Sequence, residues 1–201
     1  MSPPRARERE FVNFLQLLVD REDRAPLAAL RRGLGKTPGE AVETHRYVMP
    51  FLSRESRRGE EEAYYLIAAL FAVHQVSWPQ VEGGVKAIST NLGASLAQLV
   101  HEIERENVGG SNESIERRFV ALLNCRRDDL PNHLRHSVSL LKGRSVPVDW
   151  AQLLRDLQEW EWESRSVQRA WARAFWQRPE REAEDHGGAM GEPGDEDRSA
   201  G

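Results

Sequence analysis

The chain has 201 residues, of which 39% are hydrophobic and 30% are charged, and its formal net charge at pH 7 is −4. This length allows one domain, or two small helical lobes, with a substantial core. No apolar run approaches the roughly 20 residues of a membrane-spanning helix, and the N-terminus lacks the apolar stretch of a secretory signal. A single cysteine, Cys125, excludes an internal disulfide and a cysteine-rich zinc site. We therefore expect a cytoplasmic protein.

The charge is unevenly distributed along the chain. From residue 180 onward, eight acidic residues outnumber two arginines, which leaves a small positive excess on residues 1–179. Residues 180–201 are also rich in glycine and poor in apolar side chains, so this acidic tail is predicted to be disordered. It either shields a basic face or only aids solubility. Residues 1–179 then form the helical domain, undivided or as two lobes joined near 107–113.

Apolar residues recur at helical spacing in the first half of the chain, and glycine and proline punctuate the segments. The pattern predicts one helix to about Val19 and a second that starts after Asp23 and ends at Gly33. A short helix is expected over 39–49, closed by Pro50. The most regular stripe predicts a helix over 60–75, and a loop follows it around 78–84.

The second half continues the helical pattern. Helices are predicted through 92–103, from 115 to about Cys125, and through 130–141, with an exposed linker at 109–112. Asp149 and Gln152 form a capping-box pair for one long last helix that extends to about Trp176. No strand or hairpin signal is present. The fold class is predicted to be all-α, a compact bundle of about six to eight helices.

A basic segment runs from Ile115 to Arg144, where cations exceed anions by four in a chain whose total is negative. Such an excess suits a surface that faces nucleic-acid phosphates, because each contact replaces a condensed counterion with a fixed cation. A solvated helix face is the alternative. The cations of the segment are Arg117, Arg118, Arg126, Arg127, Arg135, Lys142 and Arg144.

No catalytic or metal-binding motif is found. His101 lacks the second histidine of a zinc helix, and His133 and His136 lack a nearby carboxylate or cysteine ligand in sequence. Cys125 is expected to be a small, buried, apolar residue. We therefore expect no enzyme activity, no metal and no cofactor.

The six tryptophans divide by helical position. Trp150, Trp160 and Trp171 share one apolar stripe and are predicted to pack in the core. Trp162 and Trp176 fall off this stripe. We expect these two side chains to stack either on nucleic-acid bases or on a partner subunit.

The order of short motifs resembles the CasB family, the small subunit of the type I-E CRISPR surveillance complex Cascade. The resemblance covers roughly Leu15 to Trp176. It rests on Leu30-Arg31-Arg32, Tyr47 with Pro50, Asn91-Leu92-Gly93, Arg117-Arg118-Phe119, Leu122-Leu123, Leu134-Arg135, and Asp149-Trp150 followed by Leu153, Leu154 and Leu157.

This resemblance implies a non-catalytic subunit whose basic face holds phosphates of the target or displaced DNA strand and stabilises the R-loop. The implied partners are the backbone subunits that hold the guide RNA, the large subunit, a second copy of the chain, the guide RNA–target DNA hybrid and displaced single-stranded DNA. No membrane or small-molecule substrate is expected. The alternative is an assembly adaptor whose basic patches dock neighbouring protein subunits.

The resemblance also ranks the cations. Arg32, Arg118, Arg127 and Arg135 stand where the family looks basic, whereas Asn124 departs from that pattern. Arg31, Arg117, Arg126, Lys142 and Arg144 surround them. Arg165 and Arg169 rank lower, because on one continuous helix Glu161 could form an ordinary ion pair with Arg165.

Overall fold

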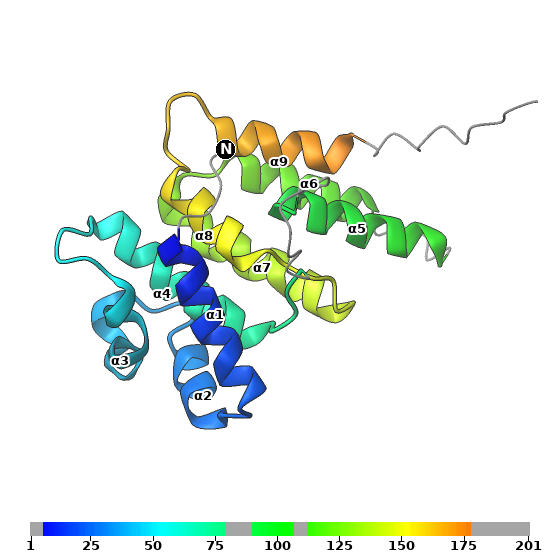
Figure 1. The fold of residues 1–201 in the computed structure, drawn as a ribbon. Helices are drawn as coiled ribbons and strands as arrows, with labels where there is room; N and C mark the ends of the chain where they lie inside the picture. The colour runs from blue at the N-terminus through cyan, green and yellow to red at the C-terminus, as the bar shows by residue number, and fades with distance from the viewer. Residues whose placement is uncertain (1–5, 79–89, 107–111, 178–201) are drawn as a thin grey trace, which may run out of the picture.

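The computed structural model describes residues 6–78, 90–106 and 112–177, and this part of the chain is all-α, as predicted (Figure 1). Four 3₁₀ turns, at Pro38–Glu40, Val42–Thr44, Met49–Phe51 and Arg127–Asp129, connect some of the α-helices. The α-helices are α1 (Ala6–Asp20), α2 (Arg24–Arg32), α3 (His45–Val48), α4 (Arg58–Val73), α5 (Leu92–Arg105), α6 (Asn112–Asn124), α7 (Leu130–Gly143), α8 (Trp150–Gln158) and α9 (Ser166–Trp176).

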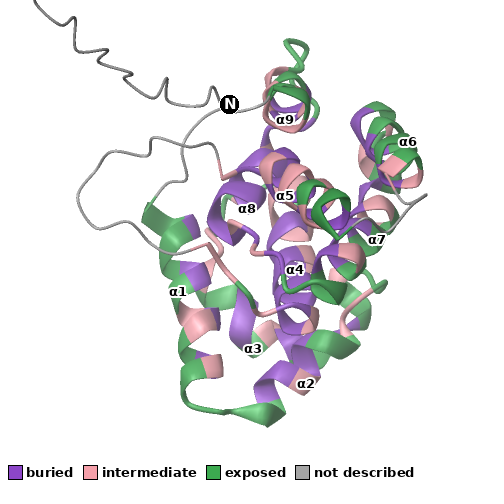
Figure 2. Cartoon of the chain, turned by 90° about the vertical axis from the view of Figure 1, so that its right-hand side faces the viewer, coloured by how far each residue is buried: buried purple, intermediate pink, exposed green. Residues whose placement is uncertain are grey.

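Two helices, α4 and α8, pack against each other at the centre of the bundle, where Figure 2 shows α8 and the second half of α4 mostly buried. The second half of α4 is apolar on nearly every side, which is the pattern of a helix surrounded by other helices. Both α1 and α2 pack on this pair from one side. Helices α5, α6, α7 and α9 lie on the other side, where α9 lies along α5, and α6 packs on α5 and α7; the short α3 instead contacts α4 near α2 (Figure 1).

One contiguous cluster of buried apolar side chains includes residues from before and after 107–113. Whether the chain divides into two lobes there stays a prediction. The acidic tail, residues 180–201, and the centres of the two predicted loops lie outside the described residues. No helix in the described part is long and apolar enough to cross a lipid bilayer.

The boundaries of α1, α2 and α4 lie within about two residues of their predicted positions, because they follow from local apolar spacing and punctuation, whereas α6 begins at Asn112, three residues before its predicted start. The structure of residues 39–49 differs from the single short helix that the sequence predicted. This segment contains two 3₁₀ turns and only one short α-helix, α3. Pro50 does not close it, since it occupies the first turn of the 3₁₀ segment Met49–Phe51, where a missing N–H is tolerated.

The prediction of one long last helix from Asp149 to Trp176 is wrong, because the structure contains α8 and α9 separated by a turn. Arg165 adopts a left-handed backbone conformation, with φ of 47°, immediately before α9. The turn contains no glycine or proline, the residues that usually signal a helix end in the sequence. Tertiary contacts hold it instead: buried Trp160 donates from Nε1 to the Cys125 carbonyl at 3.3 Å, and Gln168 donates to the Trp160 carbonyl at 2.8 Å.

A buried carboxyl group joins these two helices. Asp156 of α8 has no exposed surface and accepts hydrogen bonds from Trp171 Nε1 at 2.6 Å and from Gln152 Nε2 at 2.8 Å. Burial is the main cause that raises the pKa of Asp156 to about 7, although both hydrogen bonds oppose the rise. Next to it, Arg155 of α8 forms a buried ion pair with Glu159, the residue that follows this helix.

Close packing of α5 on α9 depends on a glycine. A Cβ atom added to Gly93 would lie 2.1 Å from the carbonyl oxygen of Trp171. Only a residue without a side chain lets the two backbones approach so closely. Trp150, Trp160 and Trp171 are at most 3% exposed, which confirms their predicted place in the core, whereas Trp162 and Trp176 are 49% and 47% exposed.

Candidate nucleic-acid interface

The basic segment folds as the packed pair α6 and α7 with a short turn between them. On α6, Ile115, Phe119, Leu122 and Leu123 are buried against the rest of the bundle. Arg117 and Arg118 are therefore exposed, as the helical periodicity predicted. The helix ends at Asn124, and Arg126 and Arg127 lie on the following turn, also as predicted.

The outer face of α7 carries cations and no acid. Leu130, Leu134, Val138 and Leu141 point into the core, which leaves Arg135 and Lys142 on the exposed face. Seven residues separate these two cations, which places them roughly 10 Å apart along one face of the helix. No aspartate or glutamate occurs between Leu130 and Gly143.

Two further hydrogen-bond donors share this face. Asn132 and His136 are exposed on the same side of α7 as Arg135. Asn132 is not among the predicted site residues, although its spacing of three residues from Arg135 places it on the same helix face. Both side chains can donate a hydrogen bond to a phosphate oxygen.

Three of the predicted arginines bind the carboxyl ends of helices instead of facing solvent freely. Arg31 donates from Nε and one terminal nitrogen to the carbonyl of Ala72, at 3.1 and 3.0 Å, near the end of α4. Arg127 donates to the carbonyl of Leu157 at 3.0 Å, near the end of α8, and also to that of Gly59. Arg165 donates to the carbonyl of Leu123, near the end of α6.

The contacts with Ala72, Leu157 and Leu123 have one physical cause, whereas Gly59 lies in the first turn of α4. The last four carbonyls of an α-helix lack partners within the helix, and the helix dipole makes that end negative. A guanidinium group supplies both the donors and the charge. These three arginines therefore cap helix C-termini, which is a structural role independent of phosphate binding.

Two further arginines form ion pairs. Arg32 lies 3.3 Å from the carboxylate of Glu43, and Arg144 pairs with Glu106, the residue that follows α5. Both pairs are at least partly exposed, where such pairs contribute little stability and exchange readily with other anions. The pair proposed between Glu161 and Arg165 is not formed, because these residues lie on the turn between α8 and α9.

The remaining predicted cations are exposed and have no hydrogen-bond or ion-pair partner within the described residues. They are Arg117, Arg118, Arg126, Arg135, Lys142 and Arg169. All except Arg169, which is on α9, belong to α6, α7 or the turn that joins them. By contrast, Arg31 and Arg32 are on α2, which packs on the other side of the bundle (Figure 2). The structure thus does not gather all predicted cations on one surface.

No group of histidine, cysteine, aspartate and glutamate side chains in the described part of the chain has the arrangement of a metal site. The half-buried Cys125 packs at the edge of the core. Burial raises the pKa of its thiol to about 11, so the reactive thiolate is scarce at neutral pH. His133 and His136 point away from the core on α7. These residues offer no evident nucleophile or metal ligand set.

Comparisons with known proteins agree on one family. The family described as CRISPR-associated protein Cse2 matches residues 26–176. A CRISPR-associated protein Cse2 from Thermus thermophilus is 36% identical over 172 residues, which cover 83% of this chain and 88% of that protein.

Solved structures extend the match to three dimensions. The crystal structure of CasB from M. ruber is 34% identical with a TM-score of 0.67, covering 85% of this chain and 93% of that one. A chain in a structure described as a CRISPR RNA-guided surveillance complex is 30% identical with a TM-score of 0.65, covering 84% of this chain and 91% of that one.

Proposed function

Because the chain belongs to the Cse2 family of CRISPR-associated proteins, we propose that it is a non-catalytic small subunit of an RNA-guided surveillance ribonucleoprotein and holds nucleic-acid phosphates on the outer face of α6 and α7. The observation that carries the phosphate-binding part is the set of exposed, unpaired cations on these two helices. Arg117, Arg118, Arg135 and Lys142 have no competing partner among the described residues.

Unpaired arginines are suited to this task for a physical reason. An arginine that already caps a helix must break its hydrogen bonds to backbone carbonyls before it can bind a phosphate with the same donors. An exposed, unpaired arginine gives up only water and counterions, and its planar fork can bridge two phosphate oxygens. Contacts of this kind read the backbone and carry no base information.

Holding one strand would help to open a duplex. Exchange of a DNA duplex for a guide RNA–DNA hybrid is nearly balanced in free energy, so modest protein contacts decide the outcome. A basic face that binds the target or the displaced strand stabilises the open R-loop. Sequence recognition is left to the guide. The partners in this proposal are the guide-holding backbone subunits, the large subunit and a second copy of the chain.

The test is R-loop formation by the reconstituted complex that contains Arg117→Ala/Arg118→Ala/Arg135→Ala. Permanganate reactivity of the displaced strand reports opening, and affinity is measured as a function of salt. If each arginine neutralises about one single-strand phosphate, the slope of log affinity against log salt falls by roughly 2 in magnitude. The loss should be similar for unrelated target sequences with matched guides.

The matched control is Arg7→Ala/Arg9→Ala/Arg21→Ala. It removes the same charge from exposed positions on and just after α1, which lies across the molecule from α6 and α7 (Figure 2). Equal losses in both triple variants would mean that only net charge matters, and the α6–α7 proposal would be rejected. Failure of the test variant to join the complex would favour the adaptor alternative, because its arginines would then be docking a protein neighbour.

A further inference from the structure

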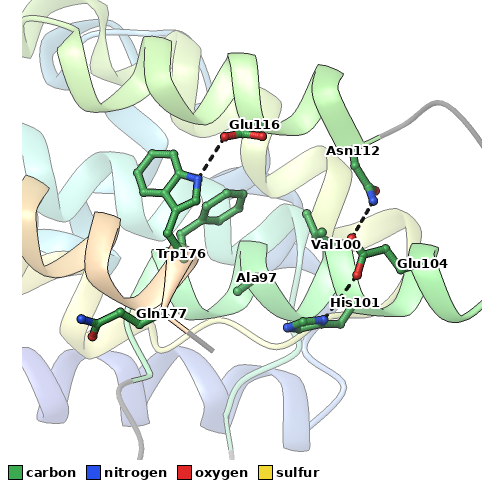
Figure 3. A pocket seen from close by; sticks show the side chains of 9 residues that line it. Ala97, Val100, His101, Glu104, Asn112, Glu116, Trp176 and Gln177 are labelled. Atoms are coloured by element: carbon green, nitrogen blue, oxygen red, sulfur yellow. Dashed lines mark hydrogen bonds and ion pairs between the residues drawn. The ribbon is translucent and has the colours of Figure 1, made fainter. Parts of the chain in front are cut away.

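A separate concave site lies between α5, α6 and α9, away from the exposed cations of α7. Its volume is about 190 Å³, and its polar lining consists of His101, Glu104, Asn112, Glu116 and Gln177, beside Trp176 (Figure 3). No lysine or arginine lines it. Glu104 and Glu116 come from different helices, α5 and α6, and only the tertiary fold places them around one cavity.

The aromatic wall of the pocket is held in place but open to solvent. Trp176 is 47% exposed, although its indole ring packs on Phe175 with centroids 5.1 Å apart. Its Nε1 donates to a Glu116 carboxylate oxygen at 3.0 Å. The hydrogen bond fixes the ring orientation. A large, ordered aromatic surface on the rim of a pocket is typical of a binding site.

The polar wall presents acceptors. Glu104 accepts from Asn112 Nδ2 at 2.9 Å, and its second oxygen lies 3.6 Å from His101 Nδ1. The Asn112 side-chain oxygen is buried, with no hydrogen-bond partner in the described part of the chain. Two carboxylates and this amide oxygen would be complemented by a cation with several N–H donors.

We propose that this pocket receives an arginine side chain of another protein subunit, with its guanidinium on the Trp176 ring and Glu104 and Glu116 as counter-charges. The volume is below the roughly 300 to 1,000 Å³ of sites for cofactors and drug-sized ligands, and it suits one side chain. Arginine is favoured over lysine because its planar group stacks on an indole while its edge donates to carboxylates.

The first experiment titrates the full-length chain with N-acetyl-arginine methylamide and follows the indole N–H resonance of Trp176 by NMR. The shift should saturate, and the lysine analogue at equal ionic strength should bind several-fold more weakly. Glu104→Gln and Glu116→Gln preserve shape and an acceptor oxygen, and each should weaken arginine binding about fivefold. The control is Glu113→Gln, which lies on α6 with Glu116 but outside the pocket, and it should not change arginine binding.

Three results of this titration would overturn the proposal. The first is equal binding of the two analogues, and the second is an equal effect of the Glu113→Gln control. The third is arginine binding that appears only in the variant Arg178→Ala/Arg181→Ala, which would assign the pocket to the chain's own terminal segment.

The second experiment identifies the occupant directly. A photo-crosslinking residue replaces Gln177, at the rim of the pocket, in the chain assembled with its partner subunits. The crosslinked peptide should come from a different protein, and changing an arginine in that peptide to alanine should abolish the crosslink. A crosslink to nucleic acid or to a second copy of this chain would refute the proposal. Since neither experiment measures phosphate binding, failure here would leave the α6–α7 proposal standing.

Discussion

Replacing Gly93 with alanine should loosen the packing of α9 on the bundle. The added Cβ would lie 2.1 Å from the Trp171 carbonyl oxygen, and 2.8 and 2.9 Å from the Trp171 carbonyl carbon and Cα. Ordinary contacts begin at 3.4 Å, so α9 would have to move outward by about 1.3 Å. Both sides of the clash are backbone, and no side-chain rotation can relieve it.

The expected cost follows from this geometry. Overpacking of a core costs about 1 to 3 kcal/mol, and a backbone clash belongs at the upper end of this range. For a protein of this size, a loss of about 3 kcal/mol lowers Tm by roughly 6 to 12 °C. The shift of α9 should also disturb Trp171, whose indole donates to Asp156 in the core.

Equilibrium urea unfolding and thermal unfolding, followed by circular dichroism, measure this cost. Gly143→Ala is the matched control, because no atom lies within 4 Å of a Cβ added at the end of α7. Alanine there should change stability by less than about 1 kcal/mol, in the stabilising direction. If Gly93→Ala were as stable as Gly143→Ala, the close approach of α5 and α9 would not exist as described.

Two further variants test the buried polar contacts. The raised pKa of Asp156 means that the folded chain keeps a proton which the unfolded chain loses near pH 4, so the wild type loses stability as pH rises from about 4 to 7. The variant Asp156→Asn lacks this titration. The difference between its free energy of unfolding and that of the wild type should therefore rise by up to about 1.4 kcal/mol per pH unit between pH 4 and 7. A difference that does not change with pH would show that the carboxyl titrates normally. Arg127→Ala should lower the free energy of unfolding by about 1 to 3 kcal/mol, because it leaves the carbonyl of Leu157, at the end of α8, without its donor. Arg118→Ala should have almost no effect on the free energy of unfolding but should flatten the salt dependence of strand binding. If Arg118→Ala destabilised the fold and Arg127→Ala did not, the distinction between capping and unpaired arginines would be contradicted.

Local sequence pattern determined the fold class and most helix boundaries of this protein. The apolar stripes of α4, α6 and α7 repeat every three to four residues, and this spacing is set by helix geometry alone. The stripe shared by Trp150, Trp160 and Trp171 also predicted their burial, although the helix between them is interrupted. These side chains are buried on both sides of the interruption, because α8 and α9 each turn an apolar face toward the same core.

The break between α8 and α9 was decided by tertiary contacts. Residues 159–165 contain neither glycine nor proline, so nothing local predicts a turn. Besides its own backbone hydrogen bonds, the turn is held by contacts with distant residues, as in the hydrogen bond from Trp160 to the Cys125 carbonyl. A continuous helix would have satisfied its own backbone but would have carried α9 away from α5.

The same physical reason limited the prediction of the binding surface. Sequence showed that cations concentrate between 115 and 144, and helical spacing placed Arg118 and Arg135 on the outside. It could not show that Arg31 and Arg127 cap helices, because the carbonyls they bind belong to residues 30 to 68 positions away along the chain. Charge and periodicity are local properties, whereas the choice between a carbonyl partner and solvent is made only when distant helix ends are brought together.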